Sequence, residues 1–195
     1  MISYRDRFGV ILFAASIALP RAAVGRVART TLDEIVEISS VIAVVEDVEV
    51  LQSEGVRVAR GTVENVMKGP PSLREVYYLA EHTWMCDIAT AKVGERSLIF
   101  LVAPGAAEAS PDERHFPAEI GGNAILRIVW SGRGRMPIRT IEGRGFVTLW
   151  DDVELPEGIE RRAGPDSRYE FIRSASLQDV SAAIRGAMSA SKAPQ

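Results

Sequence analysis

The chain has 195 residues and a net charge of −3, with 47% hydrophobic and 25% charged residues. These values are typical of one globular domain or two small ones, and they exclude a largely disordered chain, a collagen-like repeat and a multi-pass membrane protein. The single cysteine, Cys86, excludes an internal disulfide framework and a zinc site built from thiolates alone. The slightly acidic balance disfavours nucleic acid as a partner.

The first 25 residues have the three parts of a secretory signal peptide in the right order. Arg5 and Arg7 precede the apolar run Phe8–Leu19, and small residues follow it. The run is shorter than the ~20 residues that a membrane-spanning helix needs. We therefore expect cleavage after Gly25, with Ala28 as an alternative site, and a secreted or periplasmic protein without a stable membrane anchor. The alternative interpretation is a buried N-terminal helix.

Two short helices are predicted, one near each end of the mature chain. Thr31 and Glu34 have the spacing of a capping box, which predicts a helix of two turns from Leu32. Ser176 and Asp179 have the same spacing before an apolar stripe with helical period. This second pattern predicts a C-terminal amphipathic helix.

The region between these helices is predicted to be mainly β. Val41 begins a continuous β-branched run that later alternates, which indicates a strand buried first on both faces and then on one. Turns are expected at Gly55 and at Lys68-Gly69-Pro70-Pro71, and Gly61 is expected to mark a bulge. The predicted strands are 41–50, 56–66, 75–80, 97–102, 124–130 and 145–150, and the predicted loops are 81–92, 103–119, 131–137 and most of 151–172.

Several segments between residues 30 and 103 share a pattern with one known fold: 40–45, 61–63, 66–70, Cys86 and 94–101. In their order and spacing they resemble the netrin-like or TIMP-like (tissue inhibitor of metalloproteinases) form of the OB-fold, as in uncharacterised secreted bacterial proteins. The resemblance implies a five-stranded barrel in which Lys68-Gly69 joins two strands and Gly94-Glu95-Arg96 opens the strand after the cysteine loop. The metalloproteinase inhibitors chelate zinc through an N-terminal Cys-x-Cys, which this chain lacks. The resemblance therefore implies the barrel and no functional residue.

Three groups of residues are candidates for a chemical site, and none of them predicts a catalytic site or a metal-binding site. His82 and Cys86 have helical i, i+4 spacing, but two ligands do not make a zinc site, and His115 lies in a different, proline-rich segment. No signature of a cysteine nucleophile surrounds Cys86. The acidic residues between 151 and 160 lack the spacing of a calcium loop and are interpreted as a solvated loop. We expect no metal, no cofactor and no enzymatic activity.

Arginines and tryptophans supply the candidate binding residues. Arginines gather around the glycines of the 131–144 region, where guanidinium groups suit an anion or an acidic partner; the alternative is a mobile hairpin loop. The tryptophans suit either a sugar or peptide groove or the core. The predicted binding residues are Arg133, Arg135, Arg139, Trp130 and Trp150.

The prediction as a whole is an OB-fold-like five-stranded barrel with a short N-terminal helix, an added β-hairpin and a C-terminal helix. We expect an exported, non-catalytic module that binds a protein partner of the cell envelope, a protease being one candidate, through its barrel loops. The alternatives are a small-ligand or glycan-binding protein that uses the tryptophans and arginines, and an enzyme with an unrecognised site. The predicted segments are a signal peptide (1–25), the barrel core (26–103), a loop (104–119), the hairpin extension (120–172) and the C-terminal helix and tail (173–195).

Overall fold

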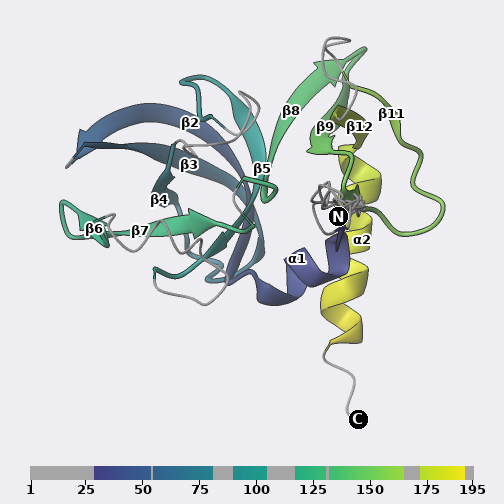
Figure 1. The fold of residues 1–195 in the computed structure, drawn as a ribbon, viewed down its shortest axis with the longest axis horizontal. Helices are drawn as coiled ribbons and strands as arrows, with labels where there is room; N and C mark the ends of the chain where they lie inside the picture. Colours follow the sequence, from purple (N-terminus) through teal and green to yellow (C-terminus); the bar gives the residue numbers. More distant parts are fainter. Residues whose placement is uncertain are drawn as a thin grey trace, which may run out of the picture.

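The computed structural model describes residues 29–53, 55–80, 90–104, 117–130, 132–164 and 172–191. The predicted signal peptide and the candidate residues His82, Trp84, Cys86 and His115 lie outside this part. The described chain is mainly β with two helices (Figure 1). Its elements are β1 (Thr30–Thr31), α1 (Leu32–Ile38), β2 (Val41–Ser53), β3 (Val56–Lys68), β4 (Glu75–Leu79), β5 (Arg96–Val102), β6 (Glu119–Ile120), β7 (Asn123–Ile128), β8 (Arg135–Ile141), β9 (Arg144–Trp150), β10 (Val153–Glu154), β11 (Arg162–Ala163), β12 (Ile172–Ser176) and α2 (Leu177–Ala190).

Hydrogen bonds join five strands into a ring. β2 pairs with β3, β3 with β4 and β5 with β2, all antiparallel. β7 then connects β4, to which it is parallel, with the end of β5, to which it is antiparallel. The order β5-β2-β3-β4 is that of a Greek key, in which the fourth strand returns beside the first. The strand predicted at 124–130 thus closes the ring.

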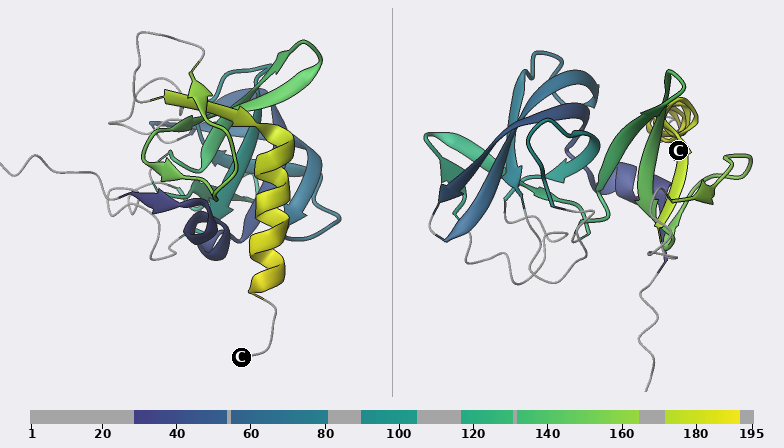
Figure 2. Two further views of the ribbon diagram at one scale, coloured as in Figure 1. Left: turned by 90° about the vertical axis from the view of Figure 1, so that its right-hand side faces the viewer. Right: turned by 90° about the horizontal axis from the view of Figure 1, so that it is seen from above.

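The hydrogen-bonded sheet continues from β5 into β8, β9, β12 and β11, and this extension, which we name the second sheet, lies beside the ring in the view from above (Figure 2). The start of β8 pairs with β5, from Ile99↔Arg135 to Ser97↔Pro137. The rest of β8 forms a hairpin with β9, and β12 and β11 continue the sheet. The predicted hairpin extension (120–172) is corrected in two respects. The strand predicted at 124–130 belongs to the ring, and the hairpin is formed by β8 and β9, with β8 beginning inside the predicted 131–137 loop. Pro137 lies where the pairing of β8 with β5 ends and its pairing with β9 begins. Proline is suited to this position because it has no backbone N–H to donate to a neighbouring strand.

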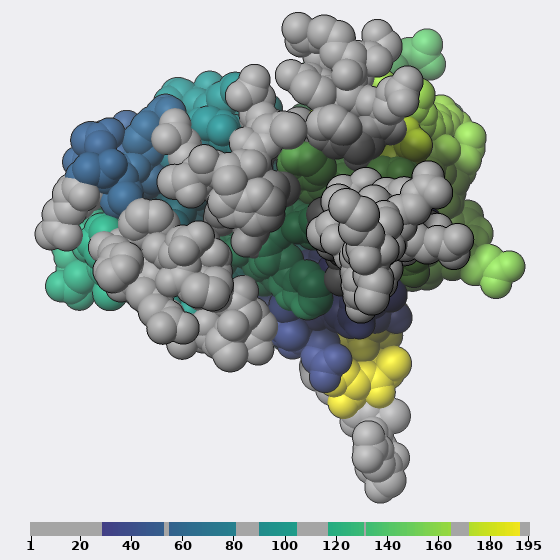
Figure 3. Space-filling view, viewed as in Figure 1, coloured from purple at the N-terminus to yellow at the C-terminus, as the bar shows by residue number. Residues whose placement is uncertain are grey.

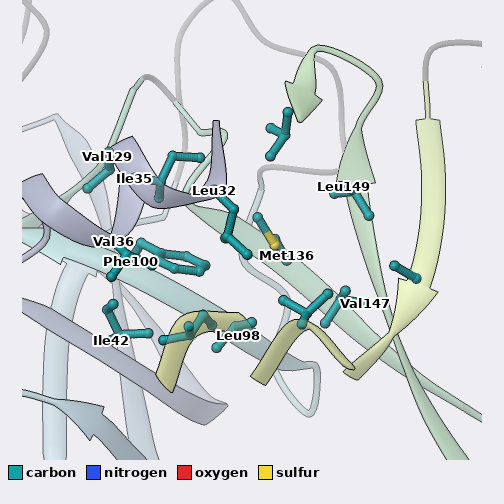
Figure 4. Packing of buried hydrophobic residues seen from close by; sticks show 14 of the residues in the cluster. Leu32, Ile35, Val36, Ile42, Leu98, Phe100, Val129, Met136, Val147 and Leu149 are labelled. Carbon is teal, nitrogen blue, oxygen red and sulfur yellow. The ribbon is translucent and has the colours of Figure 1, made fainter. Parts of the chain in front are cut away.

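The central strands β2 and β5 are buried on both faces, which explains their continuous apolar runs. Val45 and Ile99 point into the ring, with other small or β-branched side chains. Ile42 and Phe100 point to the opposite face, where they form a second core with α1, α2, β8 and β9 (Figure 4). The prediction that the first strand begins buried on both faces is confirmed.

Both helices begin where the capping patterns predict. The Thr31 hydroxyl accepts from the Glu34 N–H at 3.2 Å, and the Glu34 carboxylate accepts from the Thr31 N–H at 2.8 Å. At α2, the Ser176 hydroxyl accepts from the Asp179 N–H at 3.3 Å. Lys68 stabilises the other end of α1, because its ammonium group donates to the last carbonyls of that helix, including that of Val36 at 2.7 Å.

Candidate functional site

A buried ionic network lies where the ring meets the second sheet. The Arg135 side chain is fully buried, and its Nη2 donates to Asp47 Oδ2 at 2.8 Å and to Glu95 Oε2 at 2.6 Å. Its Nη1 donates to the Thr90 carbonyl at 3.2 Å. The hydroxyl of the buried Tyr78 donates to the other Asp47 oxygen. One cation and two carboxylates therefore satisfy one another inside the protein.

The backbone brings these residues together from four separate segments. Asp47 lies at a register shift of β2, where Val48 is the extra residue opposite Gly61 and Arg60. The bulge predicted at Gly61 therefore lies on the opposite strand, with Val48 rather than Gly61 as the extra residue. The Asp47 backbone also bonds the turn before β5, since its N–H donates to the Glu95 carbonyl at 3.0 Å and its carbonyl accepts from the Gly94 N–H at 2.7 Å.

The electrostatic environment favours a permanent cation at Arg135. Burial lowers the pKa of Arg135, but Tyr78, Asp47 and Glu95 outweigh burial and leave it raised. Burial raises the pKa of the Asp47 carboxyl, while Arg135 and the Tyr78 hydroxyl oppose the shift. Burial likewise raises the pKa of Tyr78 well above its usual range, so this hydroxyl stays protonated.

Arg133 forms a second internal ion pair. Its Nε donates to Asp152 Oδ2 at 2.9 Å and its Nη1 to the Trp130 carbonyl at 3.3 Å. Only 8% of the Arg133 side chain is exposed. Between the two arginines, Gly134 lies so close to β5 that a Cβ there would be 2.8 Å from the Phe100 carbonyl oxygen. The glycine-rich segment is thus packed against the ring.

The five predicted binding residues lie in three different environments: internal ion pairs, the second core and the surface. Arg133 and Arg135 point inward to carboxylates. Trp150 belongs to the second core, and Trp130, half-buried with a positive φ of 55°, packs against it. Arg139 is exposed on β8. Arg139 is therefore the one member of the predicted set that the described structure leaves on the surface.

An exposed face of the β8–β9 hairpin carries further side chains beside Arg139. Arg139 pairs with Phe146 and Ile141 with Arg144, and directly opposed residues point to the same side of a sheet. The guanidinium group of Arg162 on β11, which is separated from β9 by β12, lies 5.7 Å from the centroid of the Phe146 ring. The hairpin face, as we name it, consists of Arg139, Ile141, Arg144, Phe146 and Arg162.

Two of the hairpin-face arginines have no internal partner among the described residues. Arg139 and Arg144 are exposed, and neither guanidinium group forms an ion pair or hydrogen bond within that part of the chain. Ile141 is 52% exposed between them, although it is a large apolar side chain. In the space-filling view the hairpin reaches the upper outline of the molecule (Figure 3). Positive charge and apolar surface are thus presented together.

A groove of about 640 Å³ adjoins the hairpin face. It runs from the hairpin turn to the first turn of α2, and its walls carry both signs of charge: Arg144 and Arg162 face Glu160 and Asp179. Glu160 also accepts from Arg162 at 3.0 Å. This mixture of charges is suited to a polar protein surface or peptide more than to a single small anion. The remaining lining residues are Gly143, Gly145, Phe146, Ser176, Leu177 and Gln178.

Within the described ranges, no group of three or more histidine, cysteine or acidic side chains is placed to hold a metal ion. Among the same residues, no helix is both long and apolar enough to cross a membrane. Comparison of the chain with models of known protein families, with curated proteins and with solved structures finds no significant match.

Sequence reasoning missed the buried network and part of the hairpin face. The sequence patterns place Asp47 and Tyr78 in predicted strands and Glu95 at the start of another, and they mark none of the three as a site residue. One available signal was the charged residue at an inward position of β2, two residues after Val45, where the alternation predicts an apolar side chain. Phe146 and Arg162 lie on the hairpin face because of contacts between residues distant in the sequence, which no local sequence pattern predicts.

Proposed function

We propose that the chain is an exported, non-catalytic module that binds a protein partner with an acidic surface, and that the hairpin face is the contact surface. The observation that carries this proposal is the pair of exposed arginines, Arg139 and Arg144, with the exposed Ile141 between them. Arginine and large apolar side chains are enriched in protein interfaces, and positive charge accelerates the encounter with an acidic partner.

The finer fold that we propose is an OB-fold-like barrel with an added sheet. The Greek-key order of four strands and the hydrogen-bonded return through β7 support it, because the OB-fold is a five-stranded, partly open Greek-key barrel. In this proposal the added sheet, rather than the barrel loops, carries the binding surface.

Binding of a small anion or glycan by the predicted arginines and tryptophans has less support. The guanidinium groups of Arg133 and Arg135 already donate to internal carboxylates, so an external anion would have to displace buried ion pairs. Such a displacement leaves a buried charge without its partner, at a cost of about 3–5 kcal/mol. The Trp150 side chain is likewise packed in the second core.

Export is proposed from the sequence alone, on the charged start, the apolar run and the small residues of the first 25 positions. The expected mature protein begins at Arg26. The partner would then be sought in the cell envelope.

The test is affinity capture of the tagged, full-length protein from the cell envelope fraction of the cell that produces it. We compare the unmodified chain with the double variant Arg139→Glu/Arg144→Glu. The unmodified chain is expected to retain a partner that the variant loses, since each substitution reverses a charge on the hairpin face. The N-terminus of the recovered chain is read by mass spectrometry in the same experiment.

The matched control is Lys92→Glu/Arg185→Glu, which changes the net charge equally at two other exposed positions. This control is expected to retain the partner. A partner lost equally from both double variants would contradict the hairpin face as the contact surface, and recovery of a chain that still begins at Met1 would contradict export.

A further inference from the structure

One side of the outer half of β8 has no neighbouring strand in the described part of the molecule. β8 pairs with β5 only as far as Pro137, and from Ile138 to Ile141 it pairs only with β9. β5 and β8 diverge beyond this point, and β8 rises with β9 away from the ring (Figure 1). The fold therefore leaves a short open strand edge beside the hairpin face.

The hairpin register fixes which backbone groups lie on this edge. Ile141 and Arg144 flank a two-residue turn, so they exchange hydrogen bonds with each other. Bonded and non-bonded pairs alternate along an antiparallel ladder, so Arg139 is again bonded to β9. The N–H and C=O groups of Thr140 and the C=O group of Ile138 therefore point away from β9, to the open edge. The Ile138 N–H is directed to β5, because Pro137 has no N–H and its pairing with Ser97 is made through the neighbouring residues.

The side chains at this edge favour an acidic strand as its neighbour. A strand added along β8 would place alternate side chains directly beside the exposed Arg139 on the hairpin face, with Arg144 one strand further. The intervening side chains would lie on the opposite face, next to the buried Ile138. A carboxylate complements the first position and a β-branched apolar side chain the second.

The same charges disfavour a second copy of this chain on the edge. Antiparallel pairing of two β8 edges would bring the two Arg139 side chains together, and like charges that oppose each other across strands are destabilising. Exposed charge on an edge strand is a recognised protection against such self-pairing.

We propose that the partner binds by strand addition: an extended acidic segment, with carboxylate and apolar residues in alternation, pairs with Ile138–Ile141 of β8. This inference rests on the proposed function, because it assigns a binding mode to the hairpin face. Main-chain hydrogen bonds supply the affinity in such complexes, and the alternating side chains supply the specificity.

The test measures binding of a fluorescent, blocked heptapeptide in which valine and glutamate alternate, by anisotropy at low salt with the full-length protein. The decisive variant is Thr140→Pro, which removes the outward N–H and leaves the bonds between β8 and β9 in place. We expect this variant to bind at least about tenfold more weakly. Thr140→Val keeps the N–H and is expected to bind as the unmodified protein does.

The peptide provides a second test that does not depend on the folding of a variant. Methylation of alternate backbone nitrogens on the edge that pairs with β8 keeps both side-chain patterns and is expected to abolish binding. Lysine in place of glutamate is expected to weaken it.

The outcomes separate the two proposals. If Arg139→Glu abolishes binding while Thr140→Pro and the methylated peptide bind normally, strand addition is overturned and the hairpin face remains. If none of these changes alters binding, both proposals are overturned. Absence of binding by the unmodified protein at about 1 mM peptide overturns strand addition.

Discussion

At the scale of single residues, Arg135 accounts for the join between the two parts of the molecule. It begins β8, yet its guanidinium group reaches Asp47 of β2 and Glu95 before β5. Desolvation of Arg135 and Asp47 is costly, and their hydrogen bonds to each other, to Tyr78 and to the partly exposed Glu95 offset that cost. The arginine holds the start of the second sheet against the ring.

Removal of Arg135 is expected to be strongly destabilising. Arg135→Met leaves Asp47 and Glu95 without their cation and should lower the free energy of unfolding by about 3–5 kcal/mol, measured by urea denaturation. If the network acts as a unit, the double variant Arg135→Met/Asp47→Asn loses less than the sum of the two single variants. Strictly additive losses would contradict a coupled network.

Gly134 is expected to be irreplaceable for steric reasons. In Gly134→Ala the new Cβ would lie 2.8 Å from the Phe100 carbonyl oxygen and 3.0 Å from the Val129 nitrogen, both backbone atoms. The expected loss is about 1–3 kcal/mol in thermal or urea unfolding. The matched control is Gly186→Ala in α2, where no atom lies within 4 Å. This control should gain about 0.5–1 kcal/mol from helix propensity, and equal losses at both sites would refute the steric explanation.

At the scale of elements, the sequence predicted those helices and strands whose position depends on neighbouring residues in the chain. The capping box of Thr31 and Glu34 positioned α1, and the continuous apolar runs identified the doubly buried strands β2 and β5. β8 was missed because Gly132, Gly134 and Pro137 are typical of loops. Its strand geometry depends on pairing with β5 and β9, which are distant contacts that a local window does not contain.

The β8–β9 turn gives a prediction about hairpin stability. Glu142 and Gly143 have φ values of 50° and 77°, the left-handed pair of a type I′ turn, in which asparagine precedes glycine most favourably. Glu142→Asn is expected to raise the free energy of unfolding by about 1 kcal/mol, because the left-handed backbone conformation is less favourable for glutamate than for asparagine. Glu142→Val, which is β-branched, should lower it. A melting temperature that is unchanged in both variants would contradict the turn assignment.

At the scale of the whole molecule, two cores share the strands β2 and β5. Their inward side chains fill the ring, and their outward side chains pack with α1, α2 and the second sheet. The five strands of the ring lie where the apolar patterns predicted strands, at 41–50, 56–66, 75–80, 97–102 and 124–130. The candidate site was predictable only at Arg139, because burial of Arg133 and Arg135 depends on carboxylates far away in the sequence.

Both cores stabilise the fold, and in our proposal the outer end of the second sheet carries the contact surface. The hairpin face extends from the edge of the second sheet, where binding would disturb neither core. Substitutions of its exposed residues should therefore change partner binding while leaving the free energy of unfolding within about 0.5 kcal/mol, as is usual for surface positions.

The most direct test is photo-crosslinking in the cell that produces the protein, with a photoreactive phenylalanine derivative in place of Ile141. Val93 is the control, because it is also a large exposed apolar residue, 65% exposed, and lies next to the ring. We predict a discrete crosslinked complex from position 141 and none from position 93. The same adduct from both positions, or no adduct from position 141, would contradict the hairpin face as the binding surface.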